Sequence, residues 1–141
     1  MIVERVKTII QRIRKRLFPA RHLRFGAKGE HIAKTILERS GMEYLTRNFR
    51  CNGGEIDLIF REGGLLCFIE VKTRHRSLFA PERAVTREKK TRITKAALRY
   101  IRLCGLKGIE TRCDIVEVIF DGDKLSEVHH YRDAFQLVFR H

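Results

Sequence analysis

Apolar residues recur along this chain with two different periods, and each period predicts a type of secondary structure. A spacing of three to four residues is typical of a helix with one buried face, whereas alternation of apolar and polar residues is typical of a strand. The helical spacing occurs in residues 2–18, 26–40 and 84–103. Strand patterns occur in residues 43–50, 55–61, 65–72, 112–120 and 124–131. This order predicts an α/β domain with one central sheet flanked by helices.

Two further stretches lack a regular period. Residues 73–83 are polar and contain Pro81, which predicts a loop between the third strand and the last helix. The last ten residues are rich in large apolar side chains, such as Phe135 and Phe139. We therefore expect the chain to end in a closing element that packs on the core.

The first helical stretch is amphipathic and basic. Its apolar positions run from Val3 to Leu17 at helical spacing, and arginines and lysines mark the other side. We therefore divide the chain into a basic N-terminal extension, residues 1–23, and a main domain, residues 24–141. The extension could lie on a lipid surface, cover another chain or pack on its own domain, and the sequence does not choose between them.

The chain carries no pattern of a membrane-spanning or secreted protein. No stretch approaches the ~20 consecutive apolar residues that a membrane-spanning helix requires. The N-terminus lacks the apolar segment and the small-residue cleavage site of a secretory signal. We therefore expect a cytoplasmic protein with no integral membrane segment.

The strongest chemical pattern lies in the hairpin of residues 55–72. The glycine pair at 63–64 suits a two-residue hairpin loop, because glycine accepts the positive φ that such loops require. This loop sets Asp57 opposite Glu70, and Glu55 opposite Lys72. Side chains alternate along a strand, so these four side chains share one face at one end of the hairpin.

The other face of the hairpin is wholly apolar and must be buried; it comprises Ile56, Leu58, Phe60, Cys67, Ile69 and Val71. Both faces are therefore largely covered, and the carboxylates cluster at the margin of a buried sheet. Such a cluster costs several kcal/mol unless a positive group compensates it. A divalent cation would do so, and oxygen ligands of this kind suit Mg²⁺ or Mn²⁺. The alternative to a metal site is an ordinary cross-strand ion pair, such as Glu55 with Lys72.

The charge of the chain predicts a polyanionic partner. Thirty lysines and arginines against seventeen acids give a formal net charge of +13. Nucleic acid and an anionic membrane surface both fit this excess, because neutralising phosphates releases counterions. An acidic protein is a weaker option, and the excess could also serve no polyanion at all.

Much of this charge gathers just after the hairpin. Residues 72–102 contain eleven lysines and arginines and two acids. On the third predicted helix, four of the cations step by three and four residues and so form one stripe: Arg92, Lys95, Arg99 and Arg102. Together with Arg74 and Lys89 they are our candidates for contacts to nucleic-acid phosphates. A solvated helix face is the alternative.

Several common sites are absent from the sequence. The four cysteines form no C-x-x-C pair, which argues against a zinc ribbon or a thioredoxin-type site. The six histidines have no metal-ligand spacing. No G-x-x-x-x-G-K-[ST] motif occurs, which argues against nucleotide-driven activity.

The residues of the hairpin resemble a known family. Asp57, followed after twelve residues by Glu70-Val71-Lys72, resembles the PD-(D/E)-x-K signature of restriction-endonuclease-like nucleases. Longer strings are similar to the YraN family of predicted endonucleases: Gly29-Glu30, Arg47-Asn48-Phe49-Arg50, Gly54-Glu55-Ile56-Asp57-Leu58-Ile59, Glu70-Val71-Lys72-Thr73-Arg74, and later Val85 with Lys89, Arg112 with Asp114, and Ala134-Phe135. The resemblance spans residues 24–135.

The resemblance implies a fold and a set of roles. The fold would be restriction-endonuclease-like, a central mixed five-stranded sheet flanked by helices, with the basic N-terminal helix as an extra element. The carboxylates of Asp57 and Glu70 would hold Mg²⁺ or Mn²⁺ with the Val71 carbonyl, and Glu30 would be a further acid at the metal. Lys72 would orient or activate the attacking water.

Two positions depart from the family pattern. Ile56 replaces the proline that names the signature, and Cys113 occupies a position where we expect an aromatic residue. Asp114, next to that cysteine, is therefore only an accessory candidate, together with Glu55.

The predicted function is a metal-dependent nuclease that hydrolyses DNA phosphodiester bonds, with branched and recombination or repair structures among its candidate substrates. The first alternative is a non-catalytic nucleic-acid-binding protein on a nuclease scaffold. The second is a membrane-surface interaction protein that uses the N-terminal basic helix. Similarity to Holliday-junction resolvases, which act as dimers, also suggests a homodimer.

Overall fold

The computed structural model describes residues 25–76 and 85–139 of the chain. The predicted helix at residues 2–18 and the predicted boundary after residue 23 lie outside the described residues. Neither helix of the described part is long and apolar enough to cross a membrane.

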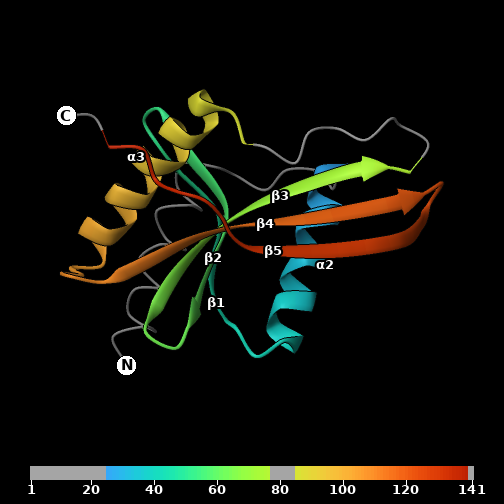
Figure 1. Cartoon of the computed structure of the whole chain (residues 1–141), viewed down its shortest axis with the longest axis horizontal. Coiled ribbons are helices and arrows are strands. Elements are labelled where there is room, and N and C mark those ends of the chain that lie inside the picture. Colours follow the sequence, from blue (N-terminus) through green and yellow to red (C-terminus); the bar gives the residue numbers. More distant parts are fainter. Residues whose placement is uncertain (1–24, 77–84, 140–141) are drawn as a thin grey trace.

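The described elements follow the predicted order and make one five-stranded sheet. They are α2 (Phe25–Arg39), β1 (Glu43–Cys51), β2 (Gly54–Glu62), β3 (Leu65–His75), α3 (Arg87–Leu103), β4 (Glu110–Asp121) and β5 (Lys124–Phe135). The strands are ordered β1-β2-β3-β4-β5; β3 and β4 are parallel, and the other neighbours are antiparallel (Figure 1). This mixed sheet with flanking helices confirms the predicted α/β class and is consistent with a restriction-endonuclease-like fold.

Two apolar clusters hold the helices on the sheet, one for each helix. The first contains Phe68 from β3 with Ile93 and Tyr100 from α3. The second contains Ala33 and Leu37 from α2 with residues of β2, β3 and β4. In Figure 1, α3 lies beside β1 and β2, and α2 lies across β3 and β4. The sheet is therefore covered on both faces, as the apolar runs of its strands predict.

Close approaches of backbone fix both helices in place. A Cβ atom at Gly29 of α2 would lie 1.9 Å from the Thr73 Oγ1 atom. A Cβ atom at Gly54 of β2 would lie 2.7 Å from the Arg92 carbonyl oxygen and 2.8 Å from the Ala96 nitrogen of α3. Only glycine fits at these two positions without a shift of the neighbouring atoms. The two contacts set the depth at which each helix crosses the sheet near the hairpin acids.

Strand β3 is longer than the sequence pattern predicts. The loop that we expected from residue 73 begins later, because β3 continues to His75 in parallel pairing with β4 up to His75↔Phe120. The polar residues 73–75 do not show the alternation of a strand. Their backbone is held by a neighbouring strand that lies more than forty residues further along the chain.

The third predicted helix begins three residues later than residue 84, at Arg87. The Thr86 side chain caps it by accepting a hydrogen bond from the Lys89 backbone nitrogen at 3.1 Å. At the other end of the domain, Phe135 is buried against the α3 side of the sheet, and the Val138 nitrogen donates to Thr94 Oγ1 at 2.8 Å. The predicted closing element thus packs on the core through its first part.

Candidate active site

The hairpin acids meet where β2 and β3 stop pairing. The ladder runs from Glu62↔Leu65 to Leu58↔Ile69, which confirms the predicted two-residue loop and register. The next pair would be Asp57 with Glu70. There the Val71 nitrogen donates instead to the Asp57 Oδ2 atom, at 2.8 Å. The strands separate at this point, and a carboxylate takes the place of a backbone acceptor.

Where the strands separate, the residue before Asp57 lies on the other face of the sheet from the one that we predicted. We predicted Ile56 on the same apolar face as Leu58 and Phe60, but Ile56 packs in the α3 cluster and the other two pack in the α2 cluster. The prediction was wrong because it assumed pairing with β3 along the whole of β2. The alternation breaks across Asp57, where the ladder with β3 ends, although Ile56 still pairs with Phe49 of β1.

Asp57 and Glu70 form a buried pair of acids. The Glu70 side chain is 12% exposed, and its Oε2 atom is buried without a hydrogen-bond partner in the described part of the chain. Burial, and then the negative charge of Asp57, raise the pKa of Glu70 to about 8. Burial likewise raises the pKa of Asp57. The raised pKa values show that the positive charge near the two carboxyl groups does not offset the cost of burying them together.

Glu30 approaches the pair from α2. Burial, and then the charge of Asp57, raise the pKa of Glu30 to about 7, although a hydrogen bond with Asn48 opposes this shift. Asn48 lies on β1 and has a φ of 49°, a left-handed conformation that asparagine tolerates better than most residues. The structure thus brings Glu30 within electrostatic reach of Asp57, as the sequence predicts.

Lys89 of α3 supplies positive charge to the cluster. Its Nζ atom lies 2.7 Å from Glu55 Oε1 and 3.7 Å from Glu70 Oε1. Arg92, one turn later, lies 3.5 Å from Glu55 Oε1. The hydrogen bond from Lys89 lowers the pKa of Glu55. Lys89 therefore lies among the acids as a shared counter-charge, and our assignment of it to phosphate contact is withdrawn.

The predicted partner of Glu55 also changes. We set Glu55 opposite Lys72 on the hairpin, but β2 and β3 no longer pair at that level. Glu55 makes its ion pairs with cations of α3 and with Arg50 of β1, at 3.8 Å. The sequence offered no sign of the contacts with α3, because Lys89 and Arg92 are more than thirty positions from Glu55.

Lys72 and Arg74 follow Glu70 on β3, and alternate residues of a strand share a face. In the parallel ladder, Lys72 is aligned with Glu117 of β4. The Arg74 Nε atom lies 3.4 Å from Glu117 Oε2, and the Arg74 side chain is only 17% exposed. Arg74 is thus engaged by an acid within the domain, and this removes the ground for its predicted phosphate contact.

Glu117 is a buried acid that the sequence reasoning missed. It is 2% exposed, and its Oε1 atom has no hydrogen-bond partner among the described residues. The signal was visible as a single acid inside the apolar run of residues 115–120. This buried carboxylate, paired with Arg74, extends the group of charged residues from Glu70 and Lys72 to β4.

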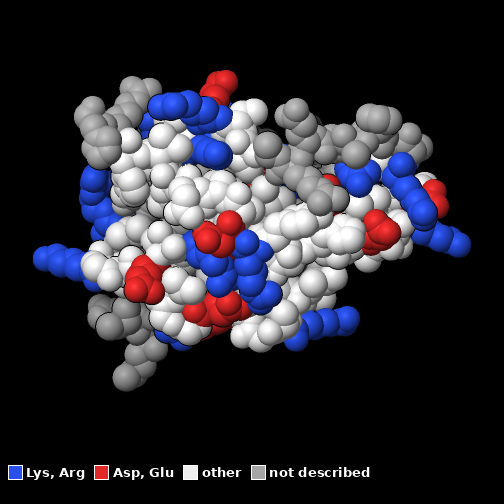
Figure 2. All heavy atoms as spheres, in the orientation of Figure 1, with Lys and Arg blue, Asp and Glu red and all other residues white. Residues whose placement is uncertain are grey.

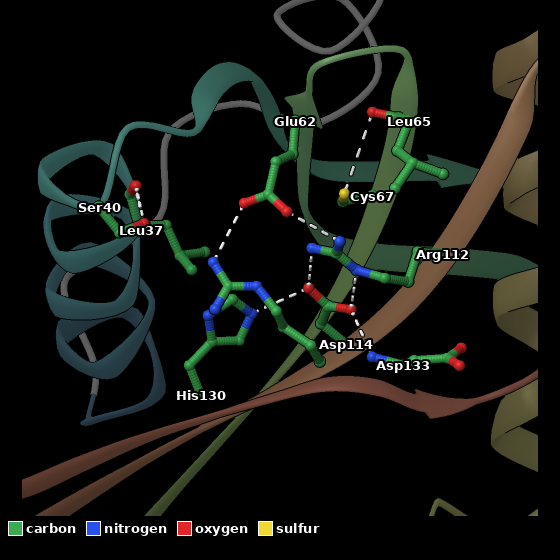
Figure 3. Close-up of polar contacts among 10 residues, drawn as sticks. Leu37, Ser40, Glu62, Leu65, Cys67, Arg112, Asp114, His130 and Asp133 are labelled. Carbon is green, nitrogen blue, oxygen red and sulfur yellow. Dashed lines mark hydrogen bonds and ion pairs between the residues drawn. The ribbon is translucent and has the colours of Figure 1, made fainter.

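Asp114, our accessory candidate, belongs to a different network. Arg112 donates to both of its carboxylate oxygens, His130 lies 2.9 Å from Oδ2, and the Asp133 nitrogen donates to Oδ1 (Figure 3). Arg112 also donates to Glu62 at 2.9 Å. Asp114 is fully buried and lies on the face of β4 opposite to Ile115 and the α3 cluster. We therefore remove it from the candidate site.

We expect Asp114→Asn to destabilise the fold without touching the hairpin acids. Burial alone would raise the pKa of Asp114, but hydrogen bonds from His130, Arg112 and the Asp133 nitrogen lower it to about 2. Asparagine would remove the buried charge that Arg112 and His130 contact and would leave Arg112 with Glu62 alone, at a cost of about 3 kcal/mol. Urea unfolding at neutral pH measures this loss. An unchanged midpoint would contradict the structural role.

The predicted stripe on α3 faces outward. Arg92, Lys95, Arg99 and Arg102 are all exposed, as their spacing predicts. Figure 2 shows lysine and arginine side chains over α3 and at several other places on that face of the molecule, with acids among them. Exposure is what a phosphate-contacting surface requires, and the contact itself stays a prediction.

The acids of the hairpin fit a divalent cation in one particular way. No three His, Cys, Asp or Glu side chains in residues 25–76 and 85–139 are grouped as a complete metal site. The predicted role of Glu30 as a further metal ligand beside Asp57 and Glu70 stays a prediction. Mg²⁺, however, is commonly held by one or two carboxylates, with waters and substrate phosphates completing its shell. The buried pair and the unpartnered Glu70 oxygen fit this arrangement.

Fold and site together define an α/β protein of restriction-endonuclease-like architecture, with a buried acid pair where two central strands separate. The model of the uncharacterised protein family UPF0102 matches residues 29–118. The chain belongs to this family, which is the YraN family, and the resemblance seen in the sequence is confirmed.

Relatives of this family align over most of the chain. A UPF0102 protein of Geobacter metallireducens is 40% identical over 115 residues, which cover 81% of this chain and 93% of the relative. A UPF0102 protein of Rhodococcus jostii is 39% identical over 117 residues, which cover 82% of this chain and 99% of the relative. Neither the family description nor these names state an activity.

Proposed function

We propose that this protein is a metal-dependent nuclease that hydrolyses DNA phosphodiester bonds. The observation that carries the proposal is the convergence of Asp57 and Glu70 where β2 and β3 separate, with the Glu70 Oε2 atom buried and unpartnered. Two acids in this position strain the metal-free fold, and a divalent cation would relieve that strain. A site that needs a cation and lies at a sheet margin suits hydrolysis of a charged ester.

The residues of the chain have distinct roles in this proposal. Asp57 and Glu70 would hold Mg²⁺ or Mn²⁺. The carbonyl of Val71, which follows Glu70 on β3, would add a ligand. The bound cation would polarise a phosphoryl oxygen and lower the pKa of its water. The Val71 nitrogen, by donating to Asp57, fixes the direction of that carboxylate. Glu30, which lies within electrostatic reach of Asp57, would be a further acid at the metal from α2.

Two lysines would neutralise two different charges, Lys89 that of the acids and Lys72 that of the phosphate. Lys89 holds Glu55 and Glu70 in place through contacts of 2.7 and 3.7 Å. Lys72, two residues after Glu70 on the same face, would orient the attacking water and stabilise the negative charge that develops on the phosphate. The net charge of +13 supports a nucleic acid as the substrate.

Cleavage of linear, flap and four-way DNA by the full chain tests this proposal. We expect cutting in Mg²⁺ or Mn²⁺ and none in EDTA, and we expect Lys72→Ala to abolish cutting while salt-sensitive binding stays nearly intact. Equal cutting by wild type and Lys72→Ala would contradict the proposal and would indicate a contaminating nuclease. Binding without cutting in either metal would instead identify a non-catalytic nucleic-acid-binding protein.

A further inference from the structure

A groove lies between α3 and the end of β1, away from the acid pair. Its volume is about 540 Å³. One wall is the end of β1 with the turn that follows, and the other is the second half of α3. The lining residues are Phe49, Arg50, Cys51, Asn52, Lys95, Leu98, Arg99, Arg102 and Leu103. The groove thus combines an apolar surface with four cations, and no acid contributes to its lining.

Three of these cations lack the counter-charges that other cations of the domain have. Within the described part of the chain, Lys95, Arg99 and Arg102 form no ion pair with an acid, and all three are exposed. By contrast, Lys89 and Arg92 at the start of the same helix both pair with Glu55. The cations of α3 that line the groove therefore differ from Lys89 and Arg92, whose charge Glu55 neutralises, and their charge is left for a ligand.

The groove and the acid pair lie along one straight element. Lys89 contacts Glu70, and Arg99 lies ten residues later on the same helix, which corresponds to about 15 Å. Successive phosphates of one strand rise by about 3.4 Å along the axis of a duplex, and their separation through space is longer. A strand that runs beside α3 would thus place a phosphate in the groove at most about four nucleotides from the acids.

We propose that this groove binds the phosphate backbone of a nucleic-acid strand, at most about four nucleotides from the bond that the acid pair cuts. The position of the cut rests on the proposed function; the binding itself does not. Lys95, Arg99 and Arg102 would contact phosphates, and Leu98 would lie against a sugar. A recessed groove admits a linear polyanion, whereas a flat membrane surface would meet only its rim. Without a base-reading pattern, such contacts hold any sequence.

Salt-dependent binding of labelled DNA in EDTA tests the groove separately from cleavage. A triple variant, Lys95→Ala with Arg99→Ala and Arg102→Ala, removes three charges from the groove. The control variant, Arg39→Ala with Lys107→Ala and Lys124→Ala, removes three exposed charges that lie outside the groove. Both variants lower the net charge equally. A difference in their DNA binding therefore shows the effect of where the charges lie.

Each phosphate contact contributes about 0.9 to the slope of log affinity against log salt for duplex DNA and about 0.7 for single strands. We expect the groove variant to lose about 3 from this slope with duplex or about 2 with single-stranded DNA, and the control to lose less than 1. The single variant Arg99→Ala, with an expected loss of about 1 or less, guards against misfolding of the triple variant.

Equal slopes for the groove and control variants would overturn the inference. So would binding of wild type to vesicles of anionic lipid but to neither form of DNA. A wild-type protein that binds DNA through the groove but never cuts it would contradict only the nuclease proposal. The two claims therefore fail on different observations.

Discussion

Asp57→Asn should abolish DNA cleavage and at the same time make the metal-free protein more stable. Asparagine keeps an oxygen that can accept from the Val71 nitrogen, so the local backbone is retained. It removes the negative charge that opposes ionisation of Glu70 and Glu30. We expect a gain of about 1–3 kcal/mol in the free energy of unfolding above neutral pH. Loss of a metal ligand should lower the cleavage rate on the order of a thousandfold or more.

The matched control for this prediction is Asp114→Asn, the same substitution at another buried aspartate. Because Asp114 is bonded by Arg112, His130 and the Asp133 nitrogen, its variant should lose stability and keep its cleavage chemistry in the folded state. Urea unfolding in EDTA and cleavage in Mg²⁺ measure the two quantities. An Asp57→Asn variant that is both less stable and fully active would show that Asp57 is an ordinary structural acid.

Removing the metal should make stability fall as the pH rises. The pKa of Glu70 is raised from 4.5 to about 8, and that of Glu30 from 4.5 to about 7. A raised acid pKa means that the folded state binds protons which the unfolded state releases. The stabilising effect is therefore complete below pH 4.5 and is lost as the pH rises towards about 8. We expect a loss on the order of a few kcal/mol across this window.

Mg²⁺ or Mn²⁺ should reverse this loss, because a cation that binds only the folded state stabilises it by mass action. Thermal unfolding at the two ends of the window, with and without metal, measures the effect. We expect a large increase in Tm from metal at the alkaline end and little at the acidic end, where the acids are protonated. Buffers that contain Na⁺ at equal ionic strength and no divalent cation control for general screening of charge by salt. A Tm that is independent of metal at every pH would contradict a metal centre.

The sequence predicted the parts of the site that one hairpin determines. The glycine loop fixed the register, and the register set Asp57 beside Glu70. The same reasoning misplaced Ile56, because it assumed that pairing with β3 continues past Leu58. Ile56 still pairs with Phe49 of β1, so local periodicity can fail where a strand loses only one of its two neighbours.

Contacts between distant segments were beyond the sequence. Lys89 is one of eleven cations between residues 72 and 102, and only the packing of α3 on β2 shows that it lies among the acids. Asp114 and Glu117 are both acids of β4. Their side chains lie on opposite faces, and their partners come from β3, β4 and β5. The register of β4 against β3 and β5 decides which of the two acids faces the site, and the sequence does not specify that register.

The most direct measurement is an anomalous-scattering map from crystals of the full chain grown with Mn²⁺. We expect one strong peak between the carboxylates of Asp57 and Glu70, within about 2–2.5 Å of an oxygen from each. The Lys89 ammonium should remain with Glu55. Crystals that show no peak there at saturating Mn²⁺, with Asp57 and Glu70 held by Lys89 alone, would contradict a metal site at this acid pair.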